Sequence, residues 1–119
     1  MKVAEYGKVA IVTKSTLDNT NTSYAQGGIA SVMYDPDHFD KHIEDTIVAG
    51  DGLCNREVVE LVVKDGPLQI DQLIRWGMDF DRDSNGQFDL AREGGHSEKR
   101  ILHHKDNTCL LYTSDAADE

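Results

Sequence analysis

A short apolar run near the start of the chain narrows the choice of fold. Residues 8–14 read KVAIVTK and follow Gly7, and glycine is typical of the position just after a helix. A helix end, a glycine and an unbroken apolar strand together are typical of an α/β unit with a buried parallel strand. We therefore predict an α/β fold, and we expect the chain to begin in the middle of such a unit, after its first strand.

Length and charge exclude several classes of protein. The chain has 119 residues, enough for one domain, and its 22 acidic and 12 basic residues give a formal net charge of −10. This charge argues against nucleic acid and anionic membranes as partners. No apolar run approaches the ~20 residues of a membrane span, and the first residues lack the apolar core of a signal peptide. Cys54 and Cys109 allow at most one disulfide, so we expect a cytoplasmic protein.

Three short helices are predicted in the middle of the chain. The first spans residues 37–49 with Asp37 as its cap. Asn55 caps the second, Gly66 and Pro67 end it, and the third spans residues 68–76. The side chains expected to face the core are Phe39, Ile43 and Ile47 in the first helix, with Val48 as a further candidate, Val58, Val59, Leu61, Val62 and Val63 in the second, and Leu68, Leu73, Ile74 and Trp76 in the third.

Residues 78–90 (MDFDRDSNGQFDL) predict a β-hairpin with Asn85 and Gly86 at its turn. The same segment allows a second interpretation, a calcium loop. Its ligands would be Asp81, Asp83, Asn85 and Asp89, with Gly86 at the position where an EF-hand loop requires glycine. The bidentate glutamate that should close such a loop is replaced by Arg92, so calcium binding is the weaker interpretation.

Two glycine-rich loops are the candidate ligand contacts. A polar stretch over residues 15–24 leads into Gly27 and Gly28, and adjacent glycines let the backbone approach a ligand closely. The alternative there is a tight turn. In residues 92–96 (REGGH), Glu93 stands beside two glycines, between an arginine and a histidine. This second loop could meet a small polar ligand or form a salt-bridged surface loop, and its residues alone leave both open.

The histidines do not predict a metal site. His38 and His42 share one face of the first predicted helix, but no cysteine or third ligand is placed to complete a site with them. Surface histidines beside acidic residues are the expectation.

Three segments, taken together, resemble L-aspartate oxidases. They are residues 21–30 (NTSYAQGGIA), residues 42–50 (HIEDTIVAG) and residues 92–97 (REGGHS) followed by RILH at 100–103. These flavoenzymes of de novo NAD synthesis, which make the precursor of quinolinate, are relatives of the succinate dehydrogenase and fumarate reductase flavoproteins. The resemblance implies a fragment of a Rossmann-like FAD-binding domain over residues 1–108, lacking the first strand with its G-x-G-x-x-G fingerprint and the capping domain. Residues 109–119 resemble a translated sequencing adapter, and we expect them to be a non-native tail.

The resemblance also assigns roles to individual residues. Lys14 is expected on the adenosine side of FAD, and Glu93 is expected to orient the amino group of the substrate. The residues that would wrap the cofactor toward its isoalloxazine ring are Asn21, Thr22, Ser23, Tyr24, Ala25, Gln26, Gly27 and Gly28. In the dehydrogenase branch a histidine bonded to FAD stands where this chain has Asn21. Because asparagine cannot form that bond, FAD is expected to be non-covalent.

The implied reaction is oxidation of L-aspartate to iminoaspartate, with oxygen or fumarate as the final acceptor and a hand-off of the product to quinolinate synthase. The cationic residues that the family uses in catalysis are expected outside this chain, so the isolated chain should be inactive and should hold FAD poorly. A fragment of a succinate dehydrogenase or fumarate reductase flavoprotein is one alternative. A small acidic calcium-binding module is the other.

Overall fold

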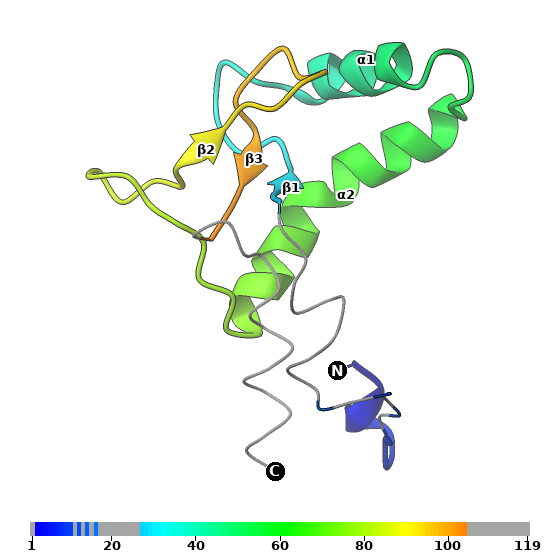
Figure 1. The fold of residues 1–119 in the computed structure, drawn as a ribbon, viewed down its shortest axis with the longest axis vertical. Coiled ribbons are helices and arrows are strands. Elements are labelled where there is room, and N and C mark those ends of the chain that lie inside the picture. Colours follow the sequence, from blue (N-terminus) through cyan, green and yellow to red (C-terminus); the bar gives the residue numbers. More distant parts are fainter. Residues whose placement is uncertain (1, 11, 13, 15, 17–26, 105–119) are drawn as a thin grey trace.

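The computed structural model describes residues 2–10, 12, 14, 16 and 27–104. In chain order its elements are a 3-10 helix η1 (Lys2–Glu5), strand β1 (Ile29–Ala30), helices α1 (Phe39–Ala49) and α2 (Arg56–Arg75), and strands β2 (Leu90–Ala91) and β3 (Ile101–Leu102). Figure 1 shows the two helices beside a small sheet, with the lower half of α2 passing close to the strands.

The sheet is antiparallel, with β3 in the centre and β1 and β2 on either side. Leu102 is paired with Ile29 on one side and with Leu90 on the other. The parallel strand predicted for residues 8–14 was wrong, because residues 8–10, 12 and 14 form no strand and are exposed, Val12 by 94%. A parallel strand needs hydrogen-bonded neighbours, and every strand in the described part of the chain comes from residues 29–102.

The N-cap of helix α1 lies one residue later than the predicted cap, Asp37. It is His38, whose Nδ1 accepts a hydrogen bond from the Lys41 N–H at 3.4 Å. Asp37 does not cap the helix because its carboxylate is bound to the Arg100 guanidinium. The cap predicted for the next helix is confirmed: the Asn55 side chain accepts from the Val58 N–H at 3.3 Å.

Helix α2 runs through Gly66 and Pro67, where the sequence predicted a stop followed by a third helix. Proline lacks the N–H that would bond the preceding turn, so it favours a bend there. Figure 1 shows α2 changing direction near its middle. The second half stays helical because it carries a core residue, Ile70, which is 1% exposed. Gly66 serves packing: a Cβ there would lie 3.1 Å from the Ser31 Oγ.

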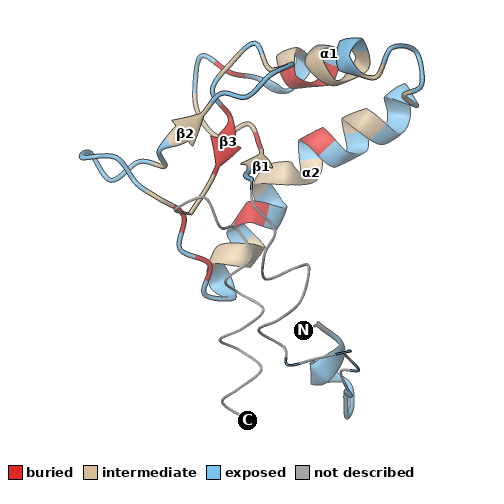
Figure 2. Ribbon diagram, viewed as in Figure 1, coloured by how far each residue is buried: buried red, intermediate tan, exposed pale blue. Residues whose placement is uncertain are grey.

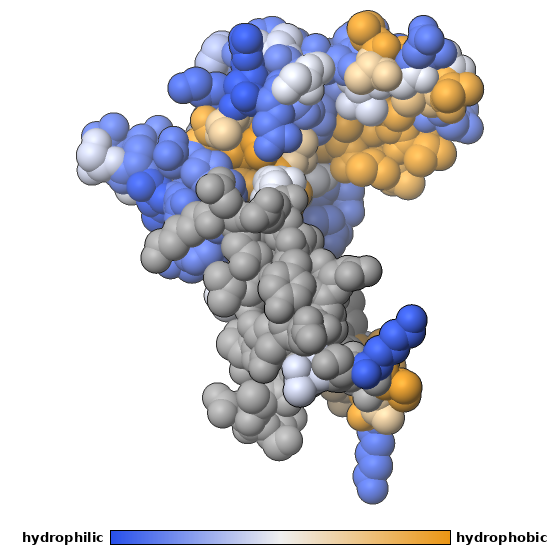
Figure 3. All heavy atoms as spheres, in the orientation of Figure 1, coloured by the Kyte–Doolittle hydropathy of each residue, from blue (hydrophilic) through white to orange (hydrophobic). Residues whose placement is uncertain are grey.

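The core lies between the second half of α2 and the sheet, as the few buried segments in Figure 2 show. Its buried members are Ile70, Met78, Phe80 and Leu102, and Leu73, Ile74, Phe88 and Leu90 are among the half-buried side chains packed against them. The prediction that the first half of α2 faces inward was largely wrong. Only Val63 is buried there, whereas Val58, Leu61 and Val62 are 54%, 69% and 64% exposed. Leu68 is also exposed, and Figure 3 shows apolar surface along the upper part of α2.

The predicted hairpin turn at Asn85 and Gly86 is confirmed. Gly86 adopts a φ of 82°, and the Asp83 N–H donates to the Gln87 carbonyl at 2.8 Å. Its two arms place Phe80 against Phe88, edge to face, with ring centroids 6.1 Å apart.

A buried ion pair joins two segments that lie 63 residues apart in the sequence. Arg100, immediately before β3, has 0% exposure, and its Nη2 and Nε donate to the two carboxylate oxygens of Asp37 at 2.7 and 2.8 Å. The bidentate geometry joins the start of α1 to the central strand.

Arg100→Lys is therefore expected to lower the free energy of unfolding by about 1–3 kcal/mol, because lysine keeps the charge but cannot donate to both oxygens of the buried carboxylate. Urea unfolding at neutral pH measures the loss. Arg75→Lys is the matched control: Arg75 pairs with Asp71 at the exposed surface of α2, at 2.6 Å, so its loss should stay below about 1 kcal/mol. Equal losses in the two variants would contradict the expectation.

Candidate functional site

The loop that carries Glu93 lies between β2 and β3 and is attached to α1. Ser97 donates from both its N–H and its Oγ to the Asp45 Oδ2, each at 2.8 Å. Lys41 and Glu98 form an ion pair at 2.5 Å between the same two elements. Figure 1 shows this loop reaching α1 beyond the sheet. The loop is thus held by contacts more than fifty residues apart in the sequence.

Beneath the loop, Arg100 is the centre of a buried polar cluster. Its Nη1 donates to the Asp45 Oδ2 at 2.5 Å and approaches the His96 Nδ1 at 3.2 Å. Because the guanidinium only donates hydrogen bonds, the His96 Nδ1 acts as the acceptor in this contact. Burial by itself would raise the pKa of Asp45, but hydrogen bonds from Ser97 and Arg100 outweigh it and lower the pKa to about 2.

His42 of α1 lies in the same cluster and is 7% exposed, with its ring 5.6 Å from that of His96. Among the described residues its Nδ1 has no hydrogen-bond partner. Burial is the largest cause that lowers the pKa of His42 below its usual 6.5, and the charge of Arg100 lowers it further. His42 therefore favours its neutral form in the folded protein.

Glu93 itself is exposed at the surface of the loop. Its carbonyl oxygen accepts the His96 N–H at 3.3 Å, which closes a turn around Gly94 and Gly95, and Gly95 adopts a φ of 84°. The ion pairs of the loop come from Glu98 and Arg100. These two residues lie just outside residues 92–96, so the choice between a ligand contact and a salt-bridged loop for that segment stays a prediction; Glu93 itself is at the surface.

The two adjacent glycines before β1 have different roles. A Cβ on Gly28 would collide with the Ile101 side chain and lie 2.7 Å from the Leu102 carbonyl oxygen, so this glycine allows β1 to pair closely with β3. At Gly27 the φ is 126°, and no atom lies within 4 Å of where a Cβ would be. Gly28 is therefore required for packing, whereas Gly27 is exposed and a Cβ there would meet no described atom.

The remaining predicted cofactor contacts are Lys14 and residues 21–26. Lys14 is exposed. The predicted contacts that lie outside the described residues are Asn21, Thr22, Ser23, Tyr24, Ala25 and Gln26. Gly28 packs against β3, and the loop that carries Glu93 connects β2 to β3.

The calcium interpretation finds no support in the described residues. The Asp83 Oδ1 accepts the N–H groups of Asn85 and Gln87 at 2.8 and 3.0 Å, so this carboxylate holds the hairpin turn. Asp81 lies against His103 at 3.2 Å. Across the described ranges, no group of three or more His, Cys, Asp or Glu side chains is arranged to hold a metal ion.

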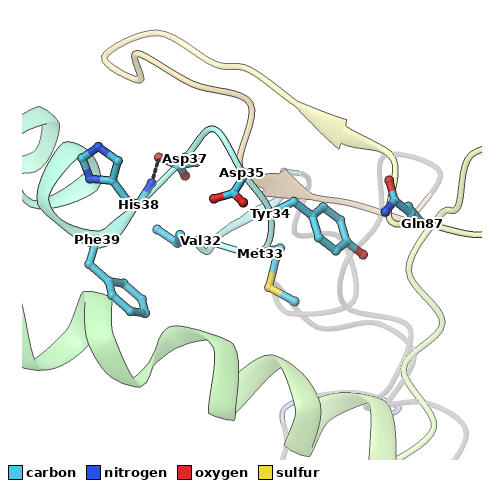
Figure 4. Close-up of a pocket in the computed structure, with 8 residues that line it drawn as sticks. All are labelled: Val32, Met33, Tyr34, Asp35, Asp37, His38, Phe39 and Gln87. Carbon is cyan, nitrogen blue, oxygen red and sulfur yellow. Dashed lines mark hydrogen bonds between the residues drawn. The ribbon is translucent and has the colours of Figure 1, made fainter.

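A pocket of about 690 Å³ opens beside the segment that follows β1, away from the predicted site residues. Its lining is Val32, Met33, Tyr34, Asp35, Asp37, His38, Phe39 and Gln87, shown in Figure 4. No sequence pattern indicates this pocket, because its walls come from an irregular segment, the start of α1 and a hairpin, which meet only in the tertiary structure. One of its polar side chains, Asp37, is already bound to Arg100.

The chain belongs to the FAD binding domain family, which it matches over residues 1–113. No helix in the described part of the chain has the length and apolar character to cross a membrane.

The similar curated proteins are L-aspartate oxidases. The chain is 46% identical over 108 residues to the chloroplastic enzyme of Oryza sativa and to one from Nicotiana tabacum, covering 91% of this chain and 17% of each relative. It is 40% identical over 108 residues to the enzyme of Acinetobacter baylyi, covering 91% of this chain and 20% of the relative. The chain therefore spans about a fifth or less of the length of these relatives.

Solved structures show the same fold in two related flavoproteins. E. coli quinol fumarate reductase matches with a TM-score of 0.74 and 34% identity, over 79% of this chain and 16% of that one. Mycobacterium smegmatis Sdh1 in complex with UQ1 matches with a TM-score of 0.75 and 32% identity, over 84% and 17%. The expected fold class, a segment of an FAD-binding flavoprotein domain, is confirmed, although its predicted parallel strand is not.

Gly28→Ala should lower the free energy of unfolding by about 1–3 kcal/mol, because the new methyl group would push β1 away from β3. Gly94→Ala is the control, since nothing lies within 4 Å of a Cβ there. Thermal and urea unfolding of the two variants measure the difference. A Gly28→Ala variant as stable as the control would show that the strands tolerate the methyl group.

The stability of the folded chain should decrease as the pH falls below about 6.5, partly because of His42. Its lowered pKa means that the unfolded chain takes up a proton at that histidine before the folded chain does. One such proton contributes at most about 1.4 kcal/mol per pH unit. Urea midpoints at pH 7.5 and 5.5 should differ less in His42→Gln than in the parent, and an unchanged difference would rule out this role.

Proposed function

We propose that this chain is a segment of an L-aspartate oxidase, which oxidises L-aspartate to iminoaspartate with non-covalent FAD in de novo NAD biosynthesis. The observation that carries the proposal is the difference in similarity. Identity reaches 46% with L-aspartate oxidases, against 34% with a fumarate reductase of closely matching fold. Oxygen or fumarate would be the final acceptor, and quinolinate synthase would receive the product.

The proposed cofactor contacts are those that the resemblance indicated, namely Lys14 and residues 21–28. FAD supplies hydride acceptance when bound, and the protein supplies binding and orientation. Gly27 supports the assignment because its φ of 126° is readily adopted only by glycine, which lets a backbone approach a cofactor closely. The catalytic cations are proposed to lie in the larger part of the protein that the relatives contain.

Glu93 is proposed to bind the ammonium group of L-aspartate. Its carboxylate is at the surface, on a turn whose base is fixed to α1. A hydrogen bond between a carboxylate and an ammonium group is charge-assisted and about twice as strong as a neutral one. Such a contact would fix the orientation of the substrate Cα.

Two further expectations stay predictions. The first is the end of the FAD-binding domain at residue 108, because the match to the family continues to residue 113. The cytoplasmic location is the other, because the names of the plant relatives place those enzymes in the chloroplast.

The second candidate is a succinate dehydrogenase or fumarate reductase flavoprotein. The structural likeness favours it, with TM-scores of 0.74 and 0.75. Asn21 argues against it, because asparagine cannot form the covalent flavin bond that the resemblance places at that position in this branch.

A segment exchange tests the proposal. Residues 7–107 replace the corresponding segment of the Acinetobacter L-aspartate oxidase, and in a second chimera that of E. coli fumarate reductase. We expect the first chimera to consume oxygen with L-aspartate, and the second to hold no covalently attached flavin after denaturation. Succinate oxidation or covalent flavin would favour the second candidate, whereas a folded, FAD-loaded first chimera without aspartate oxidation would contradict the proposal.

In the active chimera, Glu93→Gln should raise KM for L-aspartate by about tenfold or more, because loss of a charge-assisted hydrogen bond costs about 1.5–3 kcal/mol. Glu57→Gln, an exposed carboxylate in the first turn of α2, is the matched control and should leave KM unchanged. Thermal unfolding of Glu93→Gln should match the parent, since the Glu93 side chain is at the surface. An unchanged KM would remove Glu93 from the site.

A further inference from the structure

The Glu93 turn contains little that could fix its own position. Two of its four residues are glycines, and Gly95 adopts a left-handed φ of 84°. Glycines leave a loop with large conformational freedom. A carboxylate that orients a substrate must nevertheless be held within a fraction of an ångström, so rigidity has to come from another element.

Helix α1 is that element, and it holds the loop through one carboxylate oxygen of Asp45. Its Oδ2 accepts the Ser97 N–H and the Ser97 Oγ–H, both at 2.8 Å, and the Arg100 Nη1 at 2.5 Å. The side chain is 18% exposed, so solvent screens these bonds only partly. Three donors on one oxygen fix the direction in which the chain leaves the Glu93 turn.

The anchor is itself rigidly mounted. Asp45 lies on an eleven-residue helix whose start is joined to Arg100 by the buried pair with Asp37. Within the Glu93 turn, the His96 N–H donates a hydrogen bond to the Glu93 carbonyl oxygen at 3.3 Å and closes the turn. Glu93 is therefore separated from the anchored Ser97 by a single hydrogen-bonded turn.

We propose that Asp45 is a positioning residue for Glu93, holding its turn on α1 through Ser97 so that the carboxylate faces the substrate. The proposal rests on the proposed function. It adds a residue that touches neither substrate nor cofactor and acts only through the loop.

Hydrogen exchange on the 119-residue chain tests the anchor without any activity. The Ser97 amide should be protected in the parent, and Asp45→Asn should exchange it about tenfold faster, because an amide side chain forms weaker bonds than a carboxylate. Exchange in the hairpin turn around Gly86 should not change. An unprotected Ser97 amide in the parent, or an equally slow one in Asp45→Asn, would overturn the proposal.

Ser97→Ala is the milder second variant. It removes the hydroxyl bond while the backbone bond and the Arg100 contact stay, so the fold should be intact and the exchange increase smaller. Asp40→Asn is the matched control, an exposed carboxylate in the first turn of the same helix, and it should exchange like the parent. An effect of Asp40→Asn equal to that of Asp45→Asn would indicate a general effect on α1 and overturn the proposal.

Kinetics in the Acinetobacter chimera then separate positioning from general stability. Asp45→Asn should lower kcat/KM for L-aspartate by about tenfold, and the double variant Asp45→Asn, Glu93→Gln should be no worse than Glu93→Gln alone, because the anchor acts through that carboxylate. Losses that add in the double variant would overturn the proposal. If the parent chimera lacks aspartate oxidation, the proposed function fails, while the exchange result still decides whether Asp45 anchors the turn.

Discussion

The buried contact between Arg100 and Asp37 is the interaction on which the rest of the fold depends. It joins the central strand to the start of α1, across 63 residues of sequence. A buried ion pair adds little net stability compared with a well-packed apolar pair, but removing one partner leaves an uncompensated charge. Its role here is to specify arrangement: α1 must lie where the guanidinium can satisfy both oxygens, and the loop before Arg100 is then placed against α1.

That placement determines what the loop can do. Asp45 lies two turns along α1 from Asp37 and meets the same guanidinium, so one arginine orders both acids and the loop over them. Glu93 is left at the surface of a turn that is fixed at its base. In this chain, a small antiparallel sheet with two helices thus presents a carboxylate from a glycine-rich loop, and the loop is held by contacts with α1.

Local features were predicted well, and features that depend on distant partners were not. The Asn55 cap and the Asn85–Gly86 turn were correct, because each is decided by hydrogen bonds within a few residues. Asp37 was assigned to a cap because its side chain suits that position, but Arg100 competes for it and gains two charged hydrogen bonds. Nothing in the local sequence around Asp37 indicates that competitor.

By itself the sequence determined the turn chemistry and the glycine and acidic residues that mark the Glu93 loop, since these follow from local conformational preferences and side-chain types. The family was indicated by the resemblance of three segments to known enzymes. Only the tertiary structure decided that α2 continues through Pro67, that Gly28 is needed for strand packing, and that Asp45 anchors Ser97. Burial and long-range hydrogen bonds outweigh local preference at these positions, because the free energy of satisfying a buried charge or filling a core exceeds that of a helix stop or a cap.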